Sequence, residues 1–385
     1  MKPNTNTYPI SAEMLSTLHK EVTSLSSVIL SNPLLPILEN FLVKIVDKEL
    51  VLAASDQQTS IVSKLPFEGN IPASPLEIAV PARMFKETLK SLPKQPISLS
   101  VDRERYNLAI ETLNGRYRIA CENPNDFPNL FAFSQAETEI ILTSDLLQEA
   151  IKKTIFAVSK DELRPEISGV FLSLNSEGIT FVATDGHKLV SYQREDVKHN
   201  KAVTCIIPAK SLQLINQLLT GQPGKEIKLT FQEKRLQISW DHIQIIIALI
   251  NETYPDYENV IPRNNPHRLI VNTNCITTLK RLSIYTNKAT QQIRFQVSKN
   301  SIKITAEDIH FANEAHETIA CQYQGPDMEI GFNAKLLIEI LNVLPAGEEV
   351  AMALDMPNKA VPITPTTPKS NENLRMLIMP ILLNK

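Results

Sequence analysis

Apolar and polar residues alternate in three places along this chain, each time over a frame of 16 residues. The frames cover residues 41–56, 170–185 and 293–308. In each frame two alternating segments flank a short polar turn, and the frame closes with alanine, one variable residue and aspartate. Alternation with a period of two predicts strands, and the turn between them predicts an antiparallel hairpin. The apolar positions of the three frames match in register, so the chain contains an internal repeat.

Helical patterns accompany each hairpin. Residues 12–25, 145–158 and 274–285 precede the three frames, and a second amphipathic segment opens at Ala82, Ala209 and Ala334, 24 to 26 residues after the closing aspartate. An aromatic residue or methionine followed by proline then recurs at Phe127, Tyr254 and Met379. The repeat therefore extends over the whole chain as three tandem units.

Each unit combines two helices with several alternating strands, which predicts an α+β domain with its helices laid on antiparallel sheet. The periodic patterns are interrupted near residues 137 and 266. We therefore expect three domains, at residues 1–137, 138–266 and 267–385.

Composition excludes several classes of protein. Only 10 of 385 residues are glycine, and none forms a nucleotide-binding loop of the G-x-G-x-x-G or G-x-x-x-x-G-K-[ST] type. Four scattered cysteines suggest neither a disulfide framework nor a zinc site, which fits a reducing cytoplasm. The longest apolar run, at 245–250, is too short to span a bilayer, and residues 1–10 lack the apolar core of an export signal. We expect no cofactor, metal or membrane partner.

Charge is distributed unevenly along the chain. The net charge is −3, yet the six helical segments contain 10 basic and 6 acidic residues. A charged face on a single helix is usually just solvated, but a positive bias over all six indicates a surface for an anionic partner. The basic residues in question are Lys20, Arg83, Lys86, Lys90, Lys152, Lys153, Lys210, Lys280, Arg281 and Lys335.

A linear array of sheet-bearing domains leaves strand edges at both ends, and two chains joined head to tail would cover them. Twelve helices lining such a ring at a spacing of about 8–10 Å would leave a hole of about 24 Å, the width of duplex DNA. Six helices from one chain would leave almost no hole. The arithmetic presupposes closure of the ring.

Five motifs in order resemble one known family. They lie at residues 32–40, 183–189, 254–257, 328–333 and 378–381, and together they resemble the bacterial DNA polymerase III beta subunit, the sliding clamp. The resemblance implies three clamp domains and a head-to-tail homodimeric ring around double-stranded DNA. It also implies a non-catalytic processivity factor that binds the replicative polymerase and is opened by an ATP-driven clamp loader.

The resemblance further implies a pocket for a short apolar peptide from polymerases, the loader and repair proteins. By position the pocket comprises Ile167, Thr184, Gly186, His187, Lys188, Leu189, Pro255, Asn259, Val260, Ala360, Leu377, Met379, Pro380 and Ile381. Family members often carry basic residues where Asn259 and Leu382 stand here. Lys160 and Arg164 are expected to approach DNA from a loop.

The implied subunit contact brings Ile284 and Tyr285 of one chain against Tyr117 and Ile119 of the other. Such residues are as often ordinary core.

Two other interpretations compete with the clamp. Asp185 and His187 could form an acid/base pair of a hydrolase or transferase, although no nucleophile accompanies them, and the same segment could be a simple turn after the hairpin. A repeat-built adhesion or scaffold protein is the second alternative.

Overall fold

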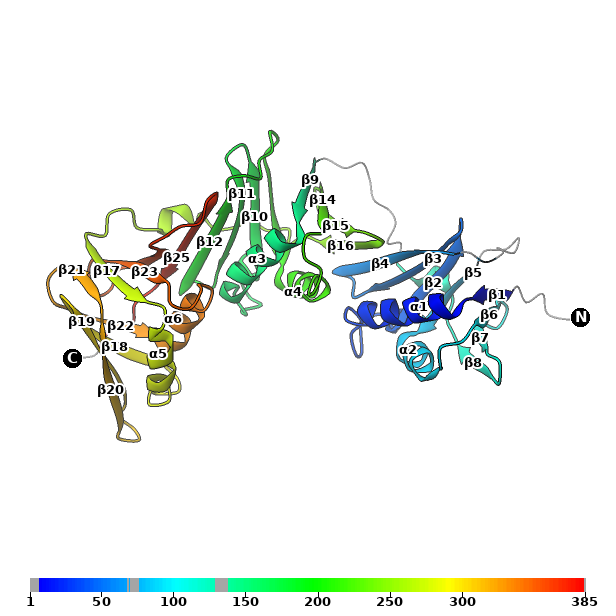
Figure 1. Ribbon diagram of the computed structural model, residues 1–385, viewed down its shortest axis with the longest axis horizontal. Helices are drawn as coiled ribbons and strands as arrows, with labels where there is room; N and C mark the ends of the chain where they lie inside the picture. Colours follow the sequence, from blue (N-terminus) through cyan, green and yellow to red (C-terminus); the bar gives the residue numbers. More distant parts are fainter. Residues whose placement is uncertain (1–6, 68, 70–75, 129–137, 384–385) are drawn as a thin grey trace, which may run out of the picture. The chain divides into compact units, whose positions relative to one another are not determined.

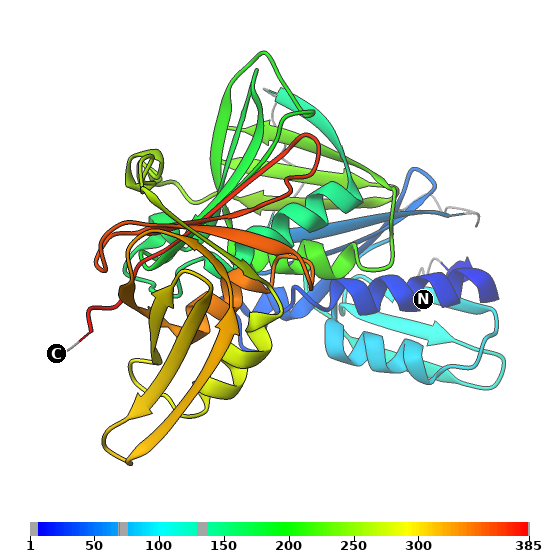
Figure 2. The ribbon, with the colours of Figure 1, turned by 60° about the vertical axis from the view of Figure 1, so that its left-hand side comes forward.

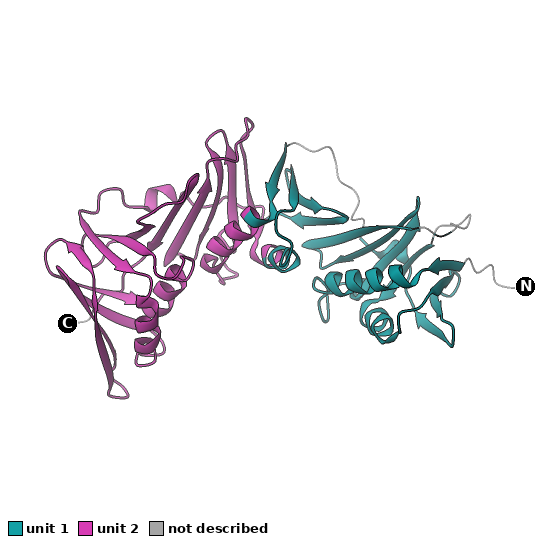
Figure 3. Cartoon of the chain, viewed as in Figure 1, with its two compact units in different colours: residues 1–145, 213–249 teal, residues 146–212, 250–385 magenta. Residues whose placement is uncertain are grey.

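The computed structural model describes residues 7–67, 69, 76–128 and 138–383. The chain forms two compact units, one of residues 1–145 and 213–249 and the other of residues 146–212 and 250–385 (Figure 3). Two helices, α3 (Ser144–Thr154) and α4 (Ala209–Leu218), contribute residues to both.

Unit 1 contains one sheet of eight strands and one of four (Figure 1). The larger sheet has the order β5-β2-β3-β4-β16-β15-β14-β9, and the smaller has the order β1-β6-β7-β8. The elements are β1 (Thr7–Ile10), α1 (Ala12–Leu25), η1 (Pro36–Glu39), β2 (Asn40–Val46), β3 (Glu49–Ser55), β4 (Thr59–Pro66), β5 (Leu76–Pro81), α2 (Ala82–Ser91), β6 (Ile97–Asp102), β7 (Asn107–Glu111), β8 (Arg116–Ala120), η2 (Pro124–Asp126), β9 (Thr138–Thr143), β14 (Glu226–Gln232), β15 (Arg235–Trp240) and β16 (Ile243–Ala248).

Unit 2 contains a nine-stranded sheet, β13-β10-β11-β12-β25-β24-β23-β17-β21, and a four-stranded sheet, β20-β19-β18-β22. Its elements are η3 (Ile155–Ala157), η4 (Pro165–Ile167), β10 (Gly169–Asn175), β11 (Gly178–Thr184), β12 (Lys188–Arg194), β13 (Val203–Pro208), η5 (Glu258–Val260), β17 (His267–Asn272), α5 (Cys275–Ser283), β18 (Gln292–Ser298), β19 (Ser301–Asp308), β20 (Asn313–Ala320), β21 (Gln322–Gln324), β22 (Met328–Asn333), α6 (Ala334–Leu341), β23 (Glu349–Leu354), β24 (Val361–Pro365) and β25 (Glu372–Ile378). The β19–β20 hairpin extends beyond the body of this unit (Figure 1 and Figure 2).

The helices form where the sequence predicts them. Helix α1 covers residues 12–25 and buries one apolar stripe, Leu15, Leu18, Val22 and Leu25, while the Ser11 hydroxyl accepts the Met14 amide at 3.2 Å as a cap. The second helices, α2, α4 and α6, begin at the three predicted alanines, each directly after a strand. The other two first helices are shorter than the sequence predicts. Helix α3 ends at Thr154, where the 3-10 helix η3 follows, and α5 ends at Ser283.

All three predicted hairpins are present, as β2–β3, β10–β11 and β18–β19. The closing aspartates have a common structural role. A side-chain oxygen of Asp56, Asp185 and Asp308 accepts the backbone N–H two residues later, at 3.1, 2.9 and 3.1 Å. These are Asx turns, which end one strand and direct the chain into the next. The repeated aspartate is therefore explained by turn geometry.

The two large sheets are continuous across the junctions between sequence repeats. Strand β4 of the first repeat pairs with β16 of the second, and β12 of the second pairs with β25 of the third, both antiparallel. This pairing is why the compact units divide the second repeat. Of the two predicted domain boundaries, residue 137 lies outside the described residues, and the boundary near 266 stays a prediction.

Among the helices of the described residues, none combines the length and apolar character needed to cross a bilayer.

Candidate partner pocket and cationic helices

A cavity of about 270 Å³ opens in unit 2 beside the turn between β11 and β12. The turn is held by its own side chains. The Thr184 hydroxyl donates to the carbonyl of Lys188 at 2.8 Å and accepts the Gly186 amide at 3.1 Å. Gly186 has a φ of +87°, a conformation that favours glycine, which explains this residue at the tip. The His187 carbonyl then accepts the Met379 amide at 2.8 Å and ties the turn to the C-terminal segment.

The floor of the cavity is apolar. Val182, Leu189 and Leu377 are buried together, and the partly buried Phe171, Tyr254, Tyr257, Ile261 and Ala360 pack against them. The rings of Phe171 and Tyr254 stack with centroids 4.9 Å apart. Burial raises the pKa of both Tyr254 and Tyr257, so both phenols are neutral near pH 7. A small apolar cavity with a polar rim suits one or two apolar side chains of a partner.

Ten of the predicted pocket residues line this cavity: Ile167, Thr184, Gly186, His187, Lys188, Leu189, Pro255, Val260, Leu377 and Met379. Four do not. Ala360 packs beneath the floor, Asn259 donates to Asp256 Oδ2 at 2.6 Å, and Ile381 forms a bridge to Gly331. Pro380 also lies off the lining.

Four further residues line the cavity without having been predicted there: Arg164, Glu166, Asp256 and Tyr257. Arg164 is exposed, and its guanidinium contacts Asp161 at 3.1 Å and donates to the Asp185 carbonyl at 3.4 Å. Its expected approach to DNA stays a prediction. Tyr257 was already part of the 254–257 motif, which was the available sequence signal.

An ion pair connects η5 to β25. Arg375 of β25 donates two hydrogen bonds to the carboxylate of Glu258, at 2.7 and 3.1 Å. The Arg375 bonds hold the pKa of Glu258 below its ordinary value, against an opposing effect of burial. This pair joins the segment after Tyr257 to the strand that carries Leu377.

Most of the predicted DNA-facing cations are solvent-exposed. Exposed side chains are those of Lys20, Arg83, Lys90, Lys152, Lys160, Lys210, Lys280, Arg281 and Lys335, and Lys86 is half-buried. Arg281 is engaged within its own unit, because it forms a two-pronged contact with Glu317 at 2.7 and 2.9 Å. The positive charge of the helices is thus accessible within each unit.

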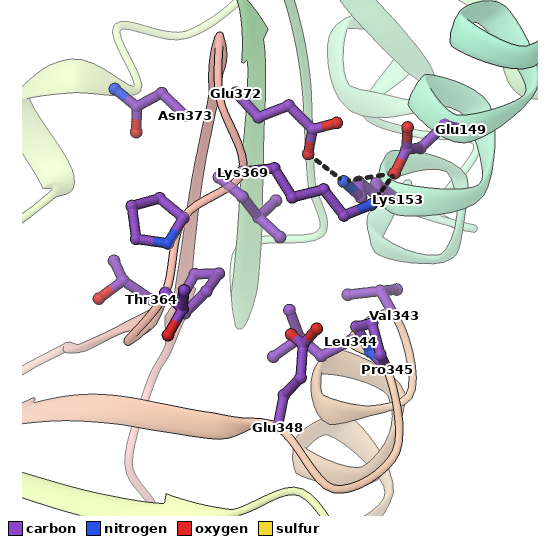
Figure 4. A pocket seen from close by; sticks show the side chains of 14 residues that line it. Glu149, Lys153, Val343, Leu344, Pro345, Glu348, Thr364, Lys369, Glu372 and Asn373 are labelled. Carbon is purple, nitrogen blue, oxygen red and sulfur yellow. Dashed lines mark hydrogen bonds and ion pairs between the residues drawn. The ribbon is translucent and has the colours of Figure 1, made fainter.

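Lys153 is a correction to the sequence prediction. Lys153 is only 8% exposed to solvent. Its ammonium lies 2.8 Å from Glu372 and 2.9 Å from Glu149 (Figure 4). It also lies 4.3 Å from the centroid of the Tyr192 ring. Lys369 also reaches Glu149, at 3.1 Å. Lys153 therefore connects α3 to β25 and does not face a solvent-accessible partner.

The residues predicted for the subunit contact differ in exposure. Tyr117 on edge strand β8 is exposed, and so are Ile284 and Tyr285 just after α5, whereas Ile119 is buried within unit 1. Exposed apolar residues beside an unpaired sheet edge are typical of an interface.

Asp185 is fully engaged in structure. One carboxylate oxygen accepts the amides of His187 and Lys188 at 2.9 Å, and the other lies 2.7 Å from the Lys188 ammonium. The geometry gives no support to an acid/base pair with His187. The four cysteines are free thiols, and burial raises the pKa of Cys121 and Cys205 to about 12.

Repeated α+β domains, accessible helix cations and a small pocket with an apolar floor are features of a protein that binds other macromolecules. Comparison with known proteins agrees. The N-terminal, central and C-terminal domain models of the DNA polymerase III beta subunit match residues 14–131, 141–256 and 258–382. The chain therefore belongs to the DNA polymerase III beta subunit family, the bacterial sliding clamps.

Individual relatives agree with this assignment. The beta sliding clamp of Vibrio cholerae is 27% identical over 332 residues, which cover 86% of this chain and 88% of the relative. The beta sliding clamp of Pseudomonas aeruginosa is 26% identical over 366 residues, 94% of this chain and 97% of the relative. A crystal structure of the Pseudomonas aeruginosa clamp bound to griselimycin superimposes with a TM-score of 0.87 at 25% identity, and covers 98% of this chain and 99% of that one.

Membership of this family settles two sequence-based predictions. The three-domain α+β clamp fold is confirmed, and the protein is a non-catalytic processivity factor of a DNA polymerase. The hydrolase or transferase alternative is not supported.

Proposed function

We propose that two copies of this chain close head to tail into a ring that encircles duplex DNA and slides along it. The sheet edges carry this proposal. The two four-stranded sheets end in β8 and β20, and together they contain the strands that would complete an eight-stranded sheet like the one in unit 1. Joining β20 of one copy to β8 of the other repeats the order β5-β2-β3-β4-β16-β15-β14-β9 with equivalent strands.

The repeat also predicts the strand register at this subunit interface, between β20 of one copy and β8 of the other. The alanine shared by the three hairpin frames pairs with Ile61 in the first repeat, with Val190 in the second and with Ala315 in the third. Ile61 in turn pairs with Ile245 across the first junction, and Val190 pairs with Met376 across the second.

Successive cross-strand pairs identify the residue of the first repeat that is equivalent to Ile245 and Met376. Ile245 pairs with Ile238, which pairs with Leu229. Met376 pairs with Ile363, which pairs with Met352, the position equivalent to Leu229. The equivalent path from Leu99 through Ile110 leads to Tyr117. Tyr117 is therefore expected opposite Ala315 of the partner subunit.

Antiparallel pairing then places Arg118 opposite the partner's Glu314. Both side chains are exposed in the single chain, and opposite charges across two strands stabilise their pairing. The register also directs Tyr117 to the face where Glu317 contacts α5, close to Ile284 and Tyr285. This agrees with the subunit contact expected from the sequence.

Exchanging the charges of Arg118 and Glu314 tests the proposed β8–β20 interface. Arg118→Glu or Glu314→Arg alone is expected to raise the dimer dissociation constant at least about tenfold, since like charges then face each other. The two changes combined restore an opposite pair and should restore the dimer in sedimentation. Lys234→Glu, an equal charge change in the exposed β14–β15 turn, is the matched control. A double variant no better than either single one would contradict the register.

The cationic helices would face the enclosed duplex. Contacts between lysines and phosphates are independent of sequence and screened by salt, so they permit movement along DNA, while topology retains the ring. On nicked circular plasmid the loaded protein should stay bound, and linearisation should release it. Equal retention on both forms would point to ordinary DNA binding. An ATP-driven loader would open the ring. We place the protein in the cytoplasm, with the bacterial chromosome.

The cavity beside the 184–188 turn would receive a short apolar peptide from the replicative polymerase, the loader and repair proteins. Its apolar floor and polar rim support this role. Because a related clamp has been crystallised with griselimycin, we propose that this compound binds here too. Griselimycin should then compete with the polymerase for the clamp. Leu189→Asp should weaken the binding of griselimycin and the binding of the polymerase.

A further inference from the structure

Glu339 lies outside the pocket lining but contacts Lys188, a residue of the turn that forms one wall of the pocket. Lys188 is only 5% exposed. Its ammonium lies 2.7 Å from Asp185 Oδ2 and 3.1 Å from Glu339 Oε2. Glu339 belongs to α6, about 150 positions away in the sequence, and is absent from the cavity lining.

We propose that Glu339 is a positioning residue for the partner pocket, acting through Lys188 and Asp185 on the shape of the 184–188 turn. This inference rests on the proposed role of the pocket. A buried ammonium needs both carboxylates, because one alone leaves part of its charge and hydrogen-bonding capacity unpaired. With Glu339 in place, the Lys188 ammonium is held beneath the turn, in contact with Asp185 Oδ2.

The Asp185 carboxylate shapes the turn through its hydrogen bonds. Its second oxygen accepts the amides of His187 and Lys188, both at 2.9 Å. Those two residues and Gly186 line the pocket, and the His187 carbonyl binds the Met379 amide. Loss of Glu339 would therefore be transmitted over a short chain of contacts to the wall that touches the partner.

The test uses the full-length protein and griselimycin as the probe. Glu339→Gln keeps the size of the side chain and removes its charge, and we expect it to raise the griselimycin dissociation constant about tenfold in calorimetry. Glu329→Gln on β22 is the matched control. It also removes a carboxylate from an ion pair of the same unit, with Arg294 at 3.4 Å, but away from the pocket. Its dissociation constant should change less than twofold.

A double-mutant cycle separates positioning from a general effect on folding. In a Lys188→Met background Glu339 has no ammonium to hold, so adding Glu339→Gln should change griselimycin affinity less than twofold. If Glu339→Gln does not fold, Glu339→Asp takes its place and should show the same dependence on Lys188.

The outcomes are distinct. Unchanged affinity in the folded Glu339 variant, or an equal loss with and without Lys188, overturns this inference alone. Failure of the unmodified protein to bind griselimycin would instead count against the proposed pocket.

Discussion

Lys152 and Lys153 are neighbours on α3 with opposite environments, and this contrast gives a sharp prediction. Lys152 is exposed, whereas the Lys153 ammonium contacts Glu149 and Glu372 in the cavity of about 480 Å³ shown in Figure 4. Lys153→Ala would leave Glu372, whose side chain is 9% exposed, with Arg194 at 3.5 Å as its remaining ion-pair partner. Lys152→Ala removes a solvated group.

The magnitude follows from the burial of the broken pair. Removing one member of a buried ion pair costs about 3–5 kcal/mol, and we take about 3 kcal/mol because Glu149 remains partly solvated. In a unit of about 200 residues, that lowers the melting temperature by about 6–12 °C. An exposed lysine contributes within about 0.5 kcal/mol, so Lys152→Ala should melt with the unmodified protein.

The measurement is thermal unfolding of both variants, followed by affinity for duplex DNA over a range of salt concentrations. Lys152→Ala should reduce the salt dependence of DNA affinity, by about one unit in the log–log slope for a lost phosphate contact, and Lys153→Ala should leave that slope unchanged while folded. A Lys153→Ala protein of normal stability with a reduced slope would refute the assignment of Lys153 to the α3–β25 connection.

Three further predictions concern acid sensitivity, the pocket and the subunit contact. Burial opposes ionisation of Glu149, but the bonds from Lys153 and Lys369 outweigh it and hold its pKa below 4.5. The resulting stabilisation is complete above pH 4.5 and is lost as the pH falls through the lower pKa of the folded state. In an acid titration, the free energy of unfolding should therefore decline less for Lys153→Ala than for the unmodified protein. Met379→Ala with Pro380→Ala should abolish polymerase stimulation and leave the dimer intact by sedimentation; a dissociated dimer would show a structural role. Ile309 and Phe311 are 80% and 72% exposed at the tip of the β19–β20 hairpin, next to the proposed joint, so Ile309→Ser with Phe311→Ser should weaken the dimer without lowering the melting temperature of the monomer.

Much of the fold could be read from the sequence because its signals are local. A hairpin requires only alternation and a turn, and the repeated aspartates supply that turn through bonds to amides two residues away. The second helices begin where a strand ends at Pro81, Pro208 or Asn333. The pocket was predicted for a different reason: the family resemblance supplied its residues by position, although they come from segments far apart in the chain.

The sequence alone predicts the threefold repeat, the positions of the helices and hairpins, and the cationic bias of the helices, because these signals are local patterns along the chain. The side-chain contacts are known only from the folded chain: which lysine of an adjacent pair faces solvent, which groups Arg164 contacts, and that Glu339 meets Lys188. Neighbouring residues on a helix point about 100° apart, and the group that covers one of them comes from a distant strand. For Lys153 that group is Glu372, 219 positions away, a separation at which no local pattern carries information.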